Sequence, residues 1–439
     1  MSNILKTFKI FKEGKMDPVS SSFCGAKWFE GTIWLYQGAT ASCHHNPFHS
    51  IELDPNDPSS LHNTSQKITE RQAMLQGEQP TGCNYCWSIE REGGISDRVL
   101  KTISIPRARL QNLLNDMSLT VMPYMLEIAF ERTCNLACAY CGPSFSSKWA
   151  NEIKNKGPYT NLITDSRYET SLDDKMIDSG DNPYIDAFFK WWPELETHLT
   201  WMRITGGEPL MSSSFWKFLD LLTESNKFKG MLSINTNLIT HKDEIDRLII
   251  KTKNFNTKIH TSVESNFDSA EYVRDGFQRD IWLTNVYKIL DNTFGVLNVT
   301  TSLNNMGVWS YIDYLQLMLE LKTKYGGHRI ETGCNFVHYP AFMRVQLIPI
   351  GLRQELVSEI QQWLATYDIT SLFNVVEVEH IQRFLTIMET APVELNETYW
   401  KTEYGLTDLQ NFVQQYDVRR GKDYRVSLDP RFVKWISNE

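Results

Sequence analysis

The sequence predicts an α/β fold: a partial (β/α)6 barrel of the TIM type, with a small metal-bound N-terminal module and a mainly helical C-terminal extension. One observation behind this prediction is that strand-like and helix-like segments alternate from about residue 120 onward, which is typical of a parallel sheet. Another is a weakly apolar N-terminal region that carries four of the eight cysteines. The predicted boundaries are 1–117 for the module and a linker helix, 118–350 for the barrel and 351–439 for the extension.

Six segments of the barrel region are expected to be strands: 125–130, 199–205, 231–237, 258–263, 297–303 and 335–338. Four segments with helical periodicity lie between them: 213–224, 242–253, 278–290 and 310–325. Six such units are too few to close an eight-stranded barrel, so we expect an open one. In parallel sheets of this kind, ligands bind at the carboxyl ends of the strands.

Composition excludes some classes of protein. The 439 residues carry a formal net charge of −9, whereas general nucleic-acid binders are normally basic. No apolar segment approaches the length of a membrane span, and the Lys-rich N-terminus contains no apolar signal-peptide core. We therefore expect a cytoplasmic protein that binds neither nucleic acid nor membrane. In that reducing compartment, cysteines are more often metal ligands than disulfide partners.

The N-terminal module is defined by Cys24, Cys43 and the pair Cys83-Asn-Tyr-Cys86. A small region of this kind typically depends on bound metal for its fold. A zinc ribbon and an all-cysteine iron–sulfur cluster both fit four cysteines, and the spacing does not separate the two. Histidines near Cys43 are further candidate ligands, although loop histidines are more often not ligands: His44, His45 and His49.

A second cysteine run, Cys134-Asn-Leu-Ala-Cys138-Ala-Tyr-Cys141, follows the first predicted strand of the barrel. Three thiols at this spacing can converge on one metal centre but leave its fourth corner without a nearby ligand. An iron–sulfur cube normally takes four thiolates, so a cube held by three is open to an exogenous ligand. The alternative is a structural zinc site that Cys334 completes.

The second predicted strand ends in a turn made of Gly206, Gly207, Glu208 and Pro209. Two glycines let a ligand approach the backbone closely, and the proline stiffens the turn. Glu208 offers a carboxylate to an ammonium group. Alone, this turn is a weak indication of function, but it lies one strand after the cysteine run.

Together, the cysteine run and the Gly-Gly-Glu-Pro turn resemble the radical S-adenosylmethionine superfamily over about residues 120–345. The resemblance implies that Cys134, Cys138 and Cys141 bind a [4Fe–4S] cluster, with Tyr140 as the aromatic residue that usually precedes the third cysteine. It implies that the amine and carboxylate of S-adenosylmethionine chelate the open iron, and that the turn holds the amine. One electron would cleave this cofactor to methionine and a 5′-deoxyadenosyl radical, which removes hydrogen from a substrate.

The resemblance extends to later strand ends. It implies that a serine at the fourth strand end contacts the ribose and that a downstream arginine pairs with the methionine carboxylate; Ser262 and Arg274 match these roles. Arginine suits a carboxylate because its planar fork binds bidentately. The other candidate cofactor-binding residues end the third and fourth strands: Asn235, Asn237 and Glu264. Neither a catalytic acid or base nor the adenine contacts are identified.

The N-terminal cysteines resemble the auxiliary module, SPASM or twitch, of some family members, placed here before the barrel. Four cysteines match one fully ligated auxiliary [4Fe–4S] cluster, and zinc remains the alternative. The resemblance further implies a small redox protein such as flavodoxin or ferredoxin as electron donor, and a peptide or small molecule as substrate. A rival hypothesis is a non-catalytic zinc-binding interaction module. Cys334 is interpreted as a small hydrophobic core residue.

Overall fold

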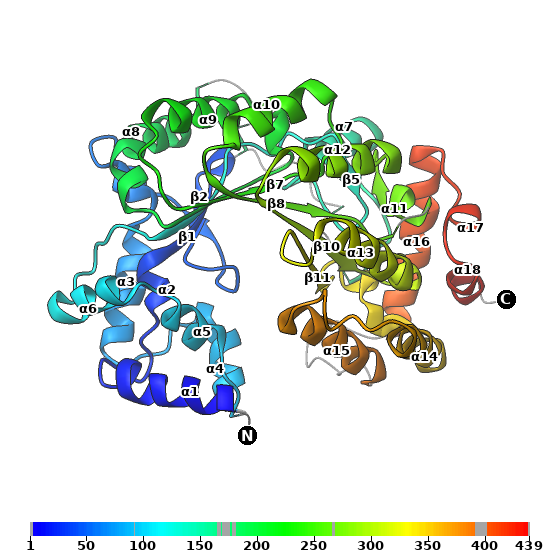
Figure 1. The fold of residues 1–439 in the computed structure, drawn as a ribbon, viewed down its shortest axis with the longest axis horizontal. Helices are drawn as coiled ribbons and strands as arrows, with labels where there is room; N and C mark the ends of the chain where they lie inside the picture. The colour runs from blue at the N-terminus through cyan, green and yellow to red at the C-terminus, as the bar shows by residue number, and fades with distance from the viewer. Residues whose placement is uncertain are drawn as a thin grey trace. The chain divides into compact units, whose positions relative to one another are not determined.

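The structure is a computed structural model that describes residues 3–91, 93–164, 168, 176–177, 181–265, 268–390 and 402–437. The chain divides into two compact units (Figure 1). The first unit contains residues 1–131, 175–206 and 212–233, and the second contains residues 132–174, 207–211 and 234–439. None of the described helices is long and apolar enough to cross a membrane.

The first unit is built on a mixed sheet with the strand order β7-β6-β4-β1-β2-β3. Its strands are β1 (Glu30–Trp34), β2 (Ala39–Ala41), β3 (His49–Ser50), β4 (Met125–Ala129), β6 (Trp201–Thr205) and the start of β7 (Met231–Asn235). Strand β4 pairs in parallel with both β6 and β1, whereas β1, β2 and β3 pair antiparallel with one another. The N-terminal region therefore extends the sheet beyond β4 instead of standing apart from it.

The helices of the first unit are α1 (Asn3–Phe11), α2 (Gly25–Phe29), α3 (Ser65–Leu75), α4 (Asn84–Arg91), α5 (Asp97–Ile103), α6 (Arg107–Asp116), α8 (Pro183–His198) and α9 (Ser213–Ser225). An apolar core of the N-terminal region is centred on Phe23, Trp28 and Trp87. The cysteine Cys83 belongs to this core, and Cys24 packs against it. The candidate ligands are therefore held by ordinary packing before any metal is considered.

The second unit contains the strand order β11-β10-β8-β7, which it builds from the end of β7, β8 (Asn256–Ser262), β10 (Val296–Leu303) and β11 (Ile330–Phe336). Strand β10 pairs in parallel with β8 and β11. A separate two-stranded ribbon joins β5 (Ala137–Cys138) to β9 (Arg274–Asp275). The helices are α7 (Ser147–Lys156), α10 (Lys242–Thr252), α11 (Asp268–Val273), α12 (Arg279–Asn292), α13 (Tyr311–Tyr325), α14 (Ile350–Thr366), α15 (Val375–Glu389), α16 (Thr402–Arg420), α17 (Tyr424–Ser427) and α18 (Pro430–Ser437).

The predicted α/β class, with parallel strands and a helical C-terminal region, is confirmed. Each of the six predicted barrel strands corresponds to an observed strand, in the predicted order along the chain. The last strand was placed too late, since it begins at Ile330. Its first half is hard to recognise in the sequence because the polar residue Thr332 occupies a buried position of the alternation and Gly333 follows it. The proposed division at residues 117 and 350 stays a prediction.

Helix α16 packs an aromatic stripe against the segment that follows the cysteine run. Phe412, at 0% exposure, lies with its ring 5.3 Å from those of both Tyr159 and Tyr168. Tyr416, four residues later and also at 0% exposure, lies 5.3 Å from the Phe412 ring. Residues four apart in a helix lie on the same face. At the start of the stripe, the carboxylate of Asp408 accepts hydrogen bonds from the backbone N–H groups of Ile163 (2.8 Å) and Thr164 (2.6 Å). The C-terminal extension is thus part of the second unit's core.

We expect Phe412→Ala to lower the free energy of unfolding by about 3–5 kcal/mol, because it removes a fully buried ring and leaves a cavity. The matched control is Val418→Ala on the same helix, where the side chain is 86% exposed and the change should stay within about 0.5 kcal/mol. Thermal unfolding measures both. Equal effects of the two substitutions would contradict the packing described for α16.

Candidate functional site

The cysteine run is fixed in place by the β5–β9 ribbon of the second unit. Cys138 lies opposite Arg274 in this ribbon, and Ala137 lies opposite Asp275. The backbone N–H of Ala139 donates to the carbonyl of Val273 (2.7 Å), and that of Cys141 donates to the carbonyl of Cys138 (2.9 Å). The loop geometry is therefore set by the segment 273–275 and not by the three cysteines alone.

The two glycines of the predicted turn are required for different reasons. Gly206 has a φ of +126°, a conformation that residues with a side chain rarely adopt. At Gly207, a Cβ atom would lie 2.3 Å from the carbonyl oxygen of Thr133 and 2.5 Å from that of Arg132. The turn therefore packs directly on the backbone that leads into the cysteine run. One hydrogen bond, from Glu208 N–H to the Thr133 carbonyl (2.7 Å), fixes this approach.

The carboxylate of Glu208 is buried and accepts three hydrogen bonds. Its Oε1 accepts from the Thr236 hydroxyl (2.7 Å) and the Leu210 N–H (3.0 Å), and its Oε2 accepts from the Asn237 N–H (2.6 Å). Burial raises the pKa of Glu208 to about 7, and the three donors act in the opposite direction. A carboxylate offers about four acceptor positions. One position on Oε2 is therefore left for a ligand.

Asn237 connects the end of β7 to the cysteine run. Its Nδ2 donates to Oδ1 of Asn135 (2.8 Å), and Asn135 in turn donates to the carbonyl of Ile239 (2.6 Å). The side chain of Asn237 thus positions the loop, and its contact with a cofactor stays a prediction. Asn235 is the last residue of β7, and Ser262 ends β8 opposite Thr300.

Glu264, Arg274 and Tyr140 form one interacting group, of which Glu264 and Arg274 are buried, although each was predicted separately. Nε of Arg274 donates to Oε2 of Glu264 (2.6 Å), and the Tyr140 hydroxyl donates to Oε1 (2.7 Å). The guanidinium also lies over the Tyr140 ring, 5.6 Å from its centroid. Among the described residues, no hydrogen bond or ion pair involves the two terminal amino groups of Arg274. A locked arginine with both terminal groups unused is suited to bidentate carboxylate binding.

Burial raises the pKa of two thiols in the run, Cys134 and Cys138. For Cys134, the neighbouring Cys138 adds to the effect of burial, whereas for Cys138 the positive charge of Arg274 opposes it. Such thiols do not ionise spontaneously near neutral pH, but a bound metal displaces their protons. The positive charge of Arg274 therefore favours the thiolate form of the cysteine opposite it, and the same charge would attract a bound anion.

The sulfur atoms of the run are not gathered as ligands of a single ion in the structure. Four sulfurs around one Zn²⁺ at about 2.3 Å lie about 3.8 Å apart. Within the part of the chain that the structure describes, no three cysteine sulfurs lie within 4.8 Å of one another. A cluster with one thiolate per iron holds its thiolates farther apart. Cys334 is likewise not grouped with the run; it is buried, and its thiol donates to the carbonyl of His380 (3.6 Å).

The four N-terminal cysteines converge in the first unit. Burial raises the pKa of Cys24 to about 12 and those of Cys83 and Cys86 to about 11, and the charge of Cys43 raises all three further. The buried ammonium of Lys27 lies among these groups and pairs with Glu70 at 2.5 Å. Burial acts to lower the pKa of Lys27, but the negative charges of Cys83 and Glu70 outweigh it and raise the pKa. The positive charge of Lys27 is therefore a fixed part of the structure beside the four thiols.

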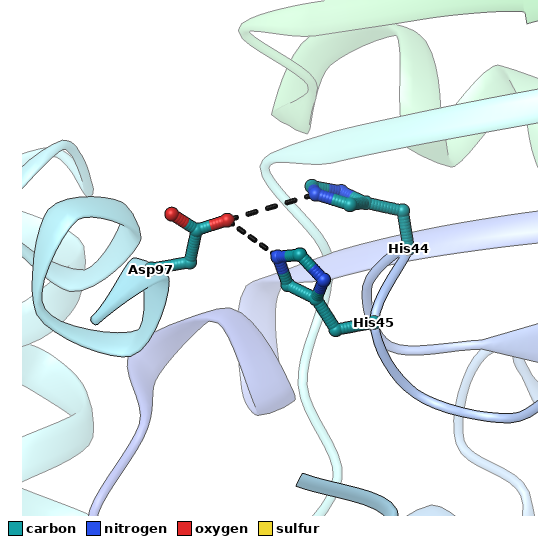
Figure 2. A group of neighbouring side chains, drawn as sticks. All are labelled: His44, His45 and Asp97. Atoms are coloured by element: carbon teal, nitrogen blue, oxygen red, sulfur yellow. Dashed lines mark hydrogen bonds and ion pairs between the residues drawn. The ribbon is translucent and has the colours of Figure 1, made fainter. Parts of the chain in front are cut away.

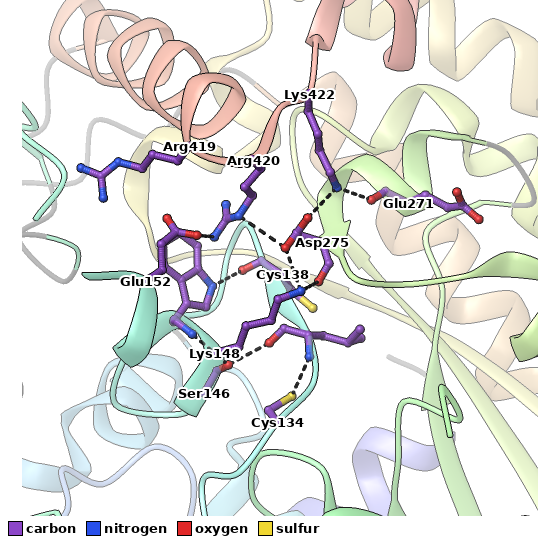
Figure 3. Close-up of polar contacts among 12 residues, drawn as sticks. Cys134, Cys138, Ser146, Lys148, Glu152, Glu271, Asp275, Arg419, Arg420 and Lys422 are labelled. Atoms are coloured by element: carbon purple, nitrogen blue, oxygen red, sulfur yellow. Dashed lines mark hydrogen bonds and ion pairs between the residues drawn. The ribbon is translucent and has the colours of Figure 1, made fainter. Parts of the chain in front are cut away.

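Sequence reasoning missed the basic residues that surround Asp275. Figure 3 shows Lys148, Arg420 and Lys422 around its carboxylate, at 2.9, 3.5 and 3.0 Å respectively. These cations hold the pKa of Asp275 below its usual range, against the effect of burial. Arg420 comes from the end of α16, 145 positions after Asp275 in the chain. No local motif signals such a contact, because only the fold brings the two segments together.

The raised pKa of Glu208 predicts a pH effect on stability. Its pKa is about 7 when folded and near 4.3 when unfolded, so the unfolded chain releases this proton first as the pH rises. Between pH 5.5 and 8.5 the wild type should lose about 2 kcal/mol of stability relative to Glu208→Gln, which does not titrate. Thermal unfolding of both proteins across this range measures the difference. A pH-independent difference would contradict the raised pKa.

No protein-family model and no curated protein matches the chain. Among solved structures, the chain is similar to SuiB of Streptococcus suis. With the precursor peptide SuiA bound, the identity is 12%, the TM-score 0.38, and the coverage 78% of this chain and 70% of SuiB. With S-adenosylmethionine bound, the identity is 13%, the TM-score 0.39, and the coverage 78% of this chain and 70% of SuiB. For SuiB alone, the identity is 13%, the TM-score 0.38, and the coverage 78% of this chain and 69% of SuiB.

Proposed function

We propose that this protein is a radical S-adenosylmethionine enzyme with an auxiliary iron–sulfur cluster. The observation that carries the proposal is the position of Arg274, directly opposite Cys138 in the β5–β9 ribbon and locked by Glu264. A carboxylate bound to its terminal amino groups would lie beside the cysteine run. This is the arrangement that chelation of a cluster-bound amino acid requires.

The residues of the run fit a [4Fe–4S] cluster. Cys134, Cys138 and Cys141 supply three thiols from one short loop, one for each of three irons. When bound, such a cluster offers one iron without a protein thiolate and supplies the electron that cleaves S-adenosylmethionine to methionine and a 5′-deoxyadenosyl radical.

Glu208 is the proposed partner of the cofactor's amine. Its carboxylate has one acceptor position left, and the other three are fixed by β7 and the turn itself. An ammonium group at this position favours the ionised carboxylate and so lowers its pKa from about 7. Glu208 and Arg274 would then bind the two ends of one amino-acid group.

The N-terminal site is proposed to hold the auxiliary cluster. Four thiols, those of Cys83 and Cys86 buried, lie near one another there, and Lys27 supplies a countercharge that a thiolate-rich, negatively charged cluster favours. Cys24, Cys43, Cys83 and Cys86 would each ligate one iron. The cluster would bind the substrate or accept its electron after hydrogen abstraction.

The partners and location follow from this chemistry. All eight cysteines are free thiols in the structure, as metal ligation in a reducing cytoplasm requires. We propose a cytoplasmic enzyme that receives electrons from a flavodoxin or ferredoxin and acts on a peptide or a small molecule. Ser262 and Asn235 end neighbouring strands and are proposed to line the cofactor site.

We expect dithionite-dependent release of 5′-deoxyadenosine from S-adenosylmethionine, with about eight irons per reconstituted chain. Cys138→Ala should abolish the release. Arg274→Lys should raise the KM for S-adenosylmethionine about ten-fold or more, because lysine keeps the charge but loses the bidentate fork. Arg279→Lys, at a partly exposed arginine five residues away, is the matched control.

A Cys83→Ala, Cys86→Ala double variant separates the two sites. It should lose about half of the iron and keep uncoupled cofactor cleavage. Tightly bound zinc together with no 5′-deoxyadenosine from the wild type would contradict the proposal and favour a non-catalytic zinc module.

A further inference from the structure

A group of three metal-binding side chains lies beside the N-terminal cysteines. Figure 2 shows His44, His45 and Asp97 turned toward one another, with Asp97 Oδ2 2.6 Å from His45 Nε2 and 3.6 Å from His44 Nε2. The three ligand atoms lie within 4.8 Å of one another. Over the described ranges, this is the one group of three or more His, Cys, Asp or Glu side chains that meets this limit.

Local structure holds the two histidines in this arrangement. They follow Cys43 in the loop after β2, and the His45 ring stacks on Tyr85 of α4 at 3.8 Å and an interplanar angle of 15°. The His44 ring lies 4.1 Å from that of His45. Asp97 is the first residue of α5, so the helix fixes the backbone from which its side chain extends toward the two histidines. The donor atoms therefore converge without a metal to gather them.

The carboxylate of Asp97 forms no ion pair with a lysine or arginine among the described residues. Its ion pairs are with the two histidines. The neighbouring Arg98 instead donates to Glu90, at 2.9 and 2.6 Å. Hydrogen bonds from His44 and His45 hold the pKa of Asp97 well below its usual range. A carboxylate faced by two imidazoles offers three ligand atoms to one cation.

We propose that His44, His45 and Asp97 form a second metal site, which binds one divalent transition-metal ion through two Nε2 atoms and one carboxylate oxygen. Two imidazoles and one carboxylate suit Fe²⁺, Co²⁺, Ni²⁺ and Zn²⁺ better than Mg²⁺ or Ca²⁺, which prefer oxygen ligands. The side chain of His44 is 64% exposed, so solvent reaches the ion. The coordination positions that protein does not fill are open to water or to a chelating group.

This site is independent of the proposed function. Its ligands contain no sulfur, and it does not depend on the identity of the metal at the four neighbouring cysteines. Binding at the triad can therefore fail while cofactor cleavage succeeds, or the reverse. Without a metal, the same contacts would be an ordinary histidine–aspartate hydrogen-bond pair, and the experiment separates the two cases.

The test uses the full-length protein, anaerobically reconstituted with iron, freed of loose metal and titrated with Co²⁺. Elemental analysis and cobalt-edge X-ray absorption read cobalt without interference from iron. We expect about one Co²⁺ per chain, with nitrogen and oxygen neighbours and no sulfur. His44→Ala and Asp97→Asn should each weaken binding roughly ten-fold or more, with the iron content unchanged.

His198→Ala is the control, because His198 is an exposed histidine in the same unit whose ring hydrogen-bonds, among the described residues, only to its own helix end. It should bind Co²⁺ like the wild type. Because the His44 side chain is largely exposed, His44→Ala is not expected to disturb the fold, and unchanged iron verifies this. The proposal is overturned by sulfur neighbours around cobalt, by the absence of stoichiometric binding, or by equal binding in His44→Ala and His198→Ala.

Discussion

The pairing of Cys138 with Arg274 in the β5–β9 ribbon is the constraint on which the rest of the candidate site depends. Two residues of each strand suffice to bring the Cys138 thiol, a proposed cluster ligand, opposite the Arg274 guanidinium. Glu264 then fixes the guanidinium through Nε and leaves its terminal amino groups for a ligand. A buried arginine without such a partner would carry a large desolvation cost. The candidate site therefore depends on the ion pair between Arg274 and Glu264 as well as on the cysteines.

The same balance of burial and countercharge recurs at both cysteine sites. Burial raises the pKa of Cys138 in the run and of Cys83 at the N-terminal site, and a basic side chain lies near each: Arg274 at the run and Lys27 at the N-terminal site. In each case the cation is itself paired with a glutamate, Glu264 or Glu70. A thiol in such surroundings is stable as a thiol without metal and becomes a thiolate when metal binds.

Much of this was predictable from the sequence, and the exceptions share a cause. The six barrel strands have β-branched or alternating apolar residues, and the cysteine run and the glycine turn are local motifs that directly follow two of them. Contacts between distant segments were not predictable: Tyr140 and Glu264 are 124 residues apart, and His45 and Asp97 are 52 apart. The parallel pairing of β1 with β4 was missed for the same reason. Propensity and motifs act locally, whereas these contacts depend on the packing of the complete fold.

The most direct test of the central claim is electron paramagnetic resonance of the dithionite-reduced Cys83→Ala, Cys86→Ala protein, with and without S-adenosylmethionine. This variant keeps the Cys134, Cys138 and Cys141 site alone. The account predicts a reduced cluster whose signal changes when S-adenosylmethionine is added, because Arg274 and Glu208 hold the ligand against its open iron. A reduced cluster whose signal is the same with and without S-adenosylmethionine would contradict it.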